Sequence, residues 1–171
     1  MAAINMDCAR KLSAYSPMME AVEYYEVDWA NKFRQPSPYR GAATPELERA
    51  WDELWRRNGG VRANVEVFHQ LHCLNMIRQY TYLDSYEERP EGFRHSEELS
   101  RTHVDHCIET LRIALMCTGD VTPVLIRLDD SRPLGADADF QTHHKCRRFD
   151  RLTDWMNLHS VPIGEDSHHH M

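Results

Sequence analysis

Two short segments of the chain carry the same pattern of histidine and cysteine. They read His69-Gln-Leu-His72-Cys73 and His103-Val-Asp-His106-Cys107, and they lie 34 positions apart. Imidazoles bind zinc, copper, iron and nickel, and nearby thiols favour copper or zinc among these metals. One such segment alone more often indicates a hydrogen-bonded core histidine. The duplication favours a metal site with the four histidines as ligands, over a hydrogen-bonded polar network or metal-free acid–base chemistry.

Both segments lie in stretches with helical periodicity, residues 64–82 and 96–117, and the polar turn between these stretches predicts a helical hairpin. Steps of three and four residues define one apolar face on each helix. These faces hold Val65, Phe68, His69, His72, Cys73, Met76, Ile77 and Tyr80 in the first helix, and Leu99, Thr102, His103, His106, Cys107, Thr110, Leu111, Ala114 and Leu115 in the second. If the faces pack together, four imidazoles and two thiols converge in apolar surroundings, where a bound metal would satisfy the nitrogens.

The cysteines and carboxylates near the histidines bear on the type of site. Cys73 and Cys107 could be metal ligands, a disulfide between the helices or small apolar fillers, and these alternatives stay open. No carboxylate lies on either apolar face, which disfavours an iron site of two histidines and one carboxylate. Glu66 and Asp105 are candidates for orienting a ligand imidazole.

Two further features lie outside the predicted hairpin or at its end. His144 is an additional candidate ligand, with a surface loop histidine as the alternative. Cys117 and Cys146 could form a disulfide or remain free, and the sequence favours neither. The five cysteines of the chain are odd in number, so at least one of them is unpaired within the chain.

The remaining sequence predicts a mainly α fold with a small β-hairpin or irregular C-terminal part. Thr44 followed by Pro45 is typical of a helix start and predicts a helix over residues 45–57. The β-prone stretch 121–128 predicts a short strand pair, and residues 147–158 predict a last helix. We expect an N-terminal arm over 1–43, a single catalytic domain over 44–158, and a tail over 159–171 whose end resembles a purification tag.

Composition excludes several classes of partner. The formal net charge of −7 gives no broad positive field for phosphates, so nucleic acid and anionic membrane surfaces are poor partners. No stretch has the roughly 18 apolar residues that cross a bilayer, so we expect the chain to be soluble. Apolar surface on the two helices would also support a homodimer.

The paired segments resemble the duplicated His-x-x-His-Cys signature of the UstYa-type family of fungal secondary-metabolite biosynthesis. The resemblance covers roughly residues 37–156. It includes Tyr39-Arg-Gly41, Ala50-Trp51-Asp52-Glu53-Leu54, Val67-Phe68, Leu111-Arg112, Met116-Cys117, Asp120-Val-Thr122 and His144-Lys-Cys146-Arg147.

The resemblance implies a copper-dependent oxidative enzyme that cyclises, hydroxylates, desaturates or halogenates a peptide or small-molecule natural product, with dioxygen or peroxide as oxidant. It also implies a location in the secretory lumen, although the membrane anchor of family members is absent from this sequence. Such a location would favour a Cys117–Cys146 disulfide. Zinc and iron are less favoured than copper. Two other functions stay open: a metal-independent cyclase or isomerase that uses the histidines as acid and base, and a non-catalytic scaffold with structural zinc.

Overall fold

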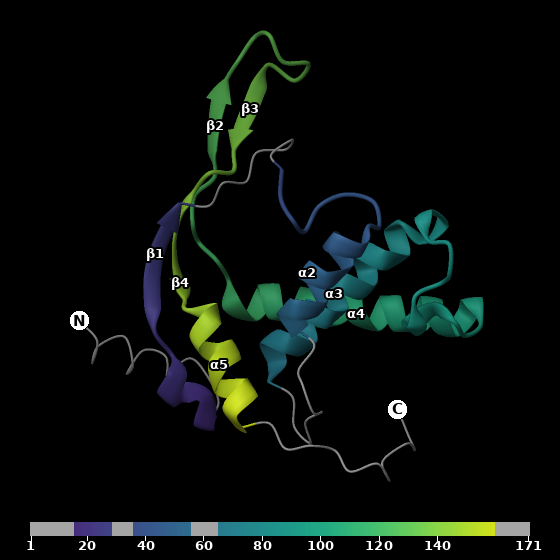
Figure 1. Cartoon of the computed structure of the whole chain (residues 1–171). Helices are drawn as coiled ribbons and strands as arrows, with labels where there is room; N and C mark the ends of the chain where they lie inside the picture. Colours follow the sequence, from purple (N-terminus) through teal and green to yellow (C-terminus); the bar gives the residue numbers. More distant parts are fainter. Residues whose placement is uncertain (1–15, 29–35, 56–64, 160–171) are drawn as a thin grey trace. The chain divides into compact units, whose positions relative to one another are not determined.

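The computed structural model describes residues 16–28, 36–55 and 65–159, and these residues form two compact units. The helical unit contains α2 (Pro45–Trp55), α3 (Glu66–Thr81), the short 3-10 turns η2 (Leu83–Ser85) and η3 (Glu91–Phe93), and α4 (Glu97–Thr118). The strand unit contains η1 (Pro17–Ala21), β1 (Tyr24–Asp28), β2 (Leu125–Leu128), β3 (Ala136–Asp139), β4 (His143–Arg147) and α5 (Phe149–His159) (Figure 1).

Local sequence sets the ends of the helices in the helical unit. The hydroxyl of Thr44 accepts a hydrogen bond from the amide of Leu47 at 3.2 Å, and that of Ser96 accepts one from the amide of Leu99 at 3.2 Å. Each hydroxyl satisfies an amide that a helix start leaves without a partner. Helix α4 ends at Gly119, whose φ of 50° is left-handed and suits glycine.

Helices α3 and α4 lie against each other as a hairpin, as the sequence predicted (Figure 1). Its core consists of five buried residues: Cys73, Met76, Phe93, Val104 and Cys107. Phe93 comes from η3, so the connection between the helices helps to fill the hairpin. This core fixes the two helices that carry the histidines relative to each other.

The buried face of α4 is rotated about the helix axis relative to the predicted one, so part of that prediction was wrong. Ser100, Val104 and Cys107 are buried, whereas Leu99 and Leu115, both expected on the buried face, are exposed. The physical reason is that α4 carries apolar side chains on more than one face, because Ile108 and Ile113 are also exposed. Spacing alone therefore did not define which line of residues would be buried.

The strand unit contains two separate antiparallel pairs. Strand β1 pairs with β4, and β2 pairs with β3 as the small hairpin that the sequence predicted. Helix α5 contacts η1, and Met18, Val22, Leu152 and Met156 are the buried apolar residues of these segments and their flanks. The expectation of an irregular arm was wrong for η1 and β1. Strand β1 was missed because its partner β4 is far away in the sequence.

The predicted fold class is confirmed: the protein is mainly α, with small antiparallel β elements. Helices α2, α3, α4 and α5 match the predicted ranges within about two residues, which is the usual uncertainty of helix ends. Within the described ranges, no helix combines the length and apolar character needed to cross a membrane. Residues 1–15 and 29–35 of the expected arm, 56–57 of the first predicted helix and 160–171 of the expected tail lie outside the described residues. The assignment of one catalytic domain over 44–158 stays a prediction.

Candidate metal centre

The antiparallel hairpin brings the four predicted histidines together as two pairs. The ring centroids of His69 and His106 are 5.8 Å apart, and the rings are tilted by 36°. Those of His72 and His103 are 6.2 Å apart, with a tilt of 46°. Each pair takes one ring from α3 and one from α4, so the first histidine of one segment faces the second histidine of the other.

The two pairs are related by the internal repeat. Adding 34 to the α3 positions converts His69 and His72 into His103 and His106, so exchanging the helices converts one pair into the other. This is an approximate twofold relation between two antiparallel helices. It makes the pairs equivalent in composition and similar in spacing.

Cys73 and Cys107 lie between the helices and are fully buried. Their thiols hydrogen-bond to each other, and no disulfide joins them. Burial, followed by the hydrogen bond with Cys73, raises the pKa of Cys107 to about 12, and burial is also the largest cause of the raised pKa of Cys73. Both thiols are therefore protonated at neutral pH. Of the three alternatives left open by the sequence, the disulfide is not formed in this structure.

The histidines are more open to solvent than the sequence suggested. His106 is exposed, the side chain of His69 is 37% exposed, and His72 and His103 are half-buried. The prediction that all four rings lie on a buried stripe was wrong because the thiols, not the rings, occupy the buried positions between the helices. The exposure allows an ion or substrate to approach the rings.

Neighbouring groups set the state of two of these rings. Burial, then the nearby imidazoles of His106 and His69, lowers the pKa of His103, so this ring is neutral at pH 7. A neutral imidazole has a lone pair for a metal. The His69 ring places Nε2 3.7 Å from Cys73 Sγ and Nδ1 3.9 Å from a carboxylate oxygen of Glu66. This separation from Glu66 is longer than a hydrogen bond, so its role in orienting a ligand imidazole stays a prediction.

The donor types and pair spacings fit a metal held by two imidazoles. Two imidazoles that share one ion, each with a metal–nitrogen bond of about 2.0–2.1 Å, have ring centroids about 5–6.5 Å apart. Both pairs fall in this range. In the described part of the chain, no group of three or more histidine, cysteine, aspartate or glutamate side chains is placed to hold one ion. The two histidine pairs are therefore the candidate metal-binding groups in this part of the chain.

The other predicted site residues lie elsewhere. Asp105 forms an ion pair with Arg101 at 3.0 Å. His144 lies on β4 in the strand unit, where its Nε2 is 2.6 Å from the hydroxyl of Thr142, and its role as a ligand stays a prediction. Cys117 ends α4 in the helical unit and Cys146 lies on β4 in the strand unit, so the disulfide that the resemblance favoured stays a prediction.

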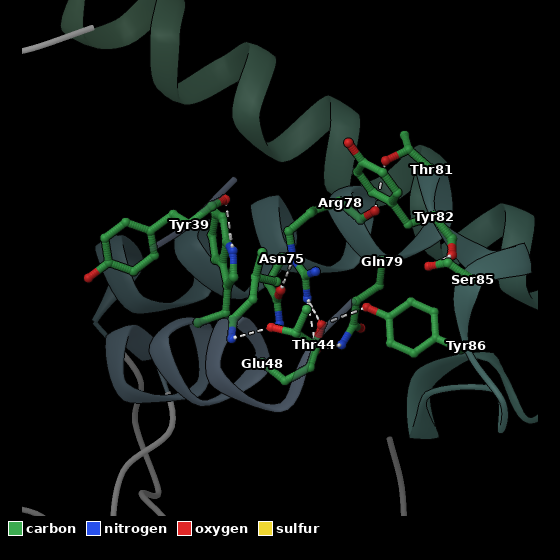
Figure 2. Close-up of polar contacts among 12 residues, drawn as sticks. Tyr39, Thr44, Glu48, Asn75, Arg78, Gln79, Thr81, Tyr82, Ser85 and Tyr86 are labelled. Atoms are coloured by element: carbon green, nitrogen blue, oxygen red, sulfur yellow. Dashed lines mark hydrogen bonds and ion pairs between the residues drawn. The ribbon is translucent and has the colours of Figure 1, made fainter. Parts of the chain in front are cut away.

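A polar cluster that the sequence did not reveal joins α2 to α3 (Figure 2). Nη2 of Arg78 donates to both carboxylate oxygens of Glu48 at 2.8 Å, and Nε donates to Asn75 at 2.9 Å. Glu48 also accepts hydrogen bonds from the Tyr86 hydroxyl at 2.8 Å and from Gln79 at 3.1 Å. Burial and the bond to Glu48 raise the pKa of Tyr86 to about 12. This Glu48 cluster fixes the helix that carries the first histidine segment.

The Glu48 cluster also breaks the internal repeat. Arg78 corresponds to Arg112, but Arg112 is exposed and pairs with Glu109 of its own helix. The sequence does show an arginine, Arg78, directly after Ile77 of the predicted apolar face of α3. Its partner could not be identified because Glu48 lies on another helix.

Comparisons with known proteins agree with the resemblance. The family model described as mycotoxin biosynthesis protein UstYa matches residues 3–59 and 55–159. No solved structure matches this chain.

Three relatives show how far the similarity extends. A protein of Diaporthe leptostromiformis named UstYa family oxidase phomYc' is 48% identical over 168 residues, which cover 92% of this chain and 66% of the relative. UstYa family oxidase phomYc of the same fungus is 44% identical over 188 residues, which cover 92% of this chain and 73% of the relative. A protein of Talaromyces islandicus named transacylase cctO is 34% identical over 198 residues, covering 96% of this chain and 66% of the relative. The chain thus spans slightly less than two thirds of the first of these relatives, and on these matches it belongs to the UstYa family.

Proposed function

We propose that the protein is a copper-dependent oxidase that tailors a small-molecule or peptide natural product of a fungus. The observation that carries the proposal is the presence of two histidine pairs, each with one ring from α3 and one from α4, in which His106 is exposed and the other three rings are partly exposed. The names of the relatives phomYc' and phomYc, both UstYa family oxidases, support the oxidative part.

Copper suits this arrangement better than structural zinc. A structural zinc site is closed by four protein ligands, whereas each histidine pair supplies two and leaves coordination positions open. Imidazoles with thiols nearby favour copper over harder ions. Bound copper would supply one-electron oxidation and the activation of dioxygen or peroxide.

The residues of the chain have separate tasks in this proposal. His69 and His106 would hold one ion, and His72 and His103 would hold the other. Glu66, whose carboxylate is 3.9 Å from Nδ1 of His69, would help to orient that ring. The hairpin core holds the helices, so that a substrate above an exposed pair meets a preformed site. A secretory-lumen location and a homodimer remain predictions from the sequence.

A second candidate function is metal-free acyl or proton transfer by the histidines. Two observations favour it: the relative named transacylase cctO and the lowered pKa of His103, which leaves a neutral imidazole able to accept a proton. This candidate requires activity without metal.

Metal content of paired variants tests the proposal. The protein is prepared without the three histidines at 168–170, which would bind metal themselves, and copper is measured by mass spectrometry. We expect two equivalents in the unchanged site. The double variant His69→Ala/His106→Ala removes one pair and should lose one equivalent, whereas His69→Ala/His103→Ala damages both pairs and should lose both.

The control is His159→Ala, which changes an exposed histidine of α5 and should leave the copper content unchanged. Equal losses in the two double variants would show that the assignment of ligands to pairs is wrong. A folded protein that takes up no copper, yet converts its substrate, would replace the oxidase proposal with the metal-free candidate.

A further inference from the structure

The buried thiol pair lies on the two helices that carry the histidine pairs and touches His69, and the proposed function does not yet use it. Cys73 and Cys107 are fully buried, face each other from α3 and α4, and share a hydrogen bond. Each cysteine directly follows the second histidine of its segment. Cys73 Sγ is 3.7 Å from Nε2 of His69, which belongs to one pair. In the sequence, Cys107 follows His103 of the other pair by four positions, as Cys73 follows His69.

From this placement we propose that Cys73 and Cys107 are an internal two-electron donor, which reduces the metal at the two histidine pairs by forming a disulfide between α3 and α4. The inference rests on the proposed function, because it takes the electron acceptor to be Cu(II). It adds a redox role for residues that would otherwise be fillers of the core. The number of thiols matches the number of histidine pairs.

The reaction is balanced by the chain and two Cu(II) ions. Two S–H bonds break, one S–S bond forms, and two protons pass to solvent. Each sulfur gives up one electron, so the dithiol is oxidised to a disulfide and two Cu(II) are reduced to two Cu(I).

Because both thiols are buried, the group that accepts their electrons must lie next to them. A diffusing oxidant attacks cysteines that are exposed, and neither thiol of the pair has any exposed surface. An ion held by His69 would be separated from Cys73 Sγ only by the contact between that ring and the thiol. The exposed Cys117 at the end of α4 has the opposite environment, so it is the matched comparison for access.

The test uses the full chain with Cys8→Ser, Cys117→Ser and Cys146→Ser, so that only the buried pair can react. Two equivalents of Cu(II) are added without oxygen. Cu(I) is measured with a colour-forming chelator, free thiols are counted by alkylation after denaturation, and the linked peptides are identified by mass spectrometry. We expect two Cu(I) per chain, loss of both thiols and a Cys73–Cys107 linked peptide.

Two further variants in this background test the route. Cys107→Ser should abolish both the formation of Cu(I) and the linked peptide. If circular dichroism shows that serine impairs folding, Cys107→Ala is used instead, with the same expected result. The double variant His69→Ala/His103→Ala should keep both thiols reduced. A disulfide that forms equally well in that double variant would overturn the inference, because the acceptor would not be the metal held by the histidines.

The copper content separates the two proposals. A chain that binds copper but keeps both thiols overturns the electron-donor role and leaves the proposed oxidase standing. A chain that binds no copper overturns both.

Discussion

Replacement of Glu48 by glutamine should destabilise the protein far more than an ordinary surface change. Nη2 of Arg78 lies 2.8 Å from both carboxylate oxygens, and the side chains of Arg78 and Glu48 are 8% and 29% exposed. Glu48→Gln leaves the buried guanidinium with its charge and without a counter-ion. Loss of one partner of a buried ion pair costs about 3–5 kcal/mol. Because water reaches part of Glu48, we expect a loss of about 2–4 kcal/mol in the free energy of unfolding.

Urea unfolding followed by circular dichroism measures this loss. The matched control is Glu46→Gln on the same helix, whose carboxylate is 3.5 Å from Arg49 with both side chains exposed. An exposed pair contributes below about 1 kcal/mol, so the control should change little. Equal losses in the two variants, or a loss below about 1 kcal/mol for Glu48→Gln, would refute the reasoning from burial.

Three further predictions concern other parts of the structure. The hydrogen bond to Asp28 raises the pKa of His143. The resulting stabilisation of the β1–β4 pair is therefore fully present below the ordinary histidine pKa of 6.5, and it is lost as the pH rises through the raised pKa. Hydrogen exchange of the β1 amides measures this loss. The free energy of unfolding should fall as pH rises from 10.0 to about 12, because folding favours the neutral Tyr86, and Tyr86→Phe should remove that fall. Gly119→Ala, at a left-handed φ of 50°, should cost about 1–2 kcal/mol in urea unfolding.

Each of these predictions has a contrary result. If the β1 amides of Asp28→Asn exchange with the same pH dependence as those of the unchanged protein, then His143 does not stabilise β1 through the Asp28 carboxylate. An unchanged alkaline fall in Tyr86→Phe would assign the fall to other groups. A neutral Gly119→Ala would show that α4 ends equally well without a left-handed residue.

Local patterns in the sequence predicted the helices well. Helix α4 illustrates why, since Ser96 caps its start and Gly119 ends it, and both effects act within a few residues. The pairing of β1 with β4 was not predicted, because five residues without clear alternation give no information about a partner far along the chain.

The sequence identified the four histidines and the hairpin, but not their depth in the structure. The rotation of α4 places Val104 and Cys107 inward and leaves His106 exposed, and this choice depends on the fit of Phe93 and other side chains in the core. Periodicity describes one helix at a time. For the same reason it could not predict that Glu48 would reach Arg78 from another helix.

The crossed arrangement of the histidine pairs has a consequence for inheritance. A duplicated segment is usually free to diverge, since one copy can keep the original task. Here each pair draws one ring from each copy, so in the proposed metal centre a mutation in either copy would damage a pair that the other copy also serves. If the pairs bind metal as proposed, neither copy could be lost while the other continued to function alone.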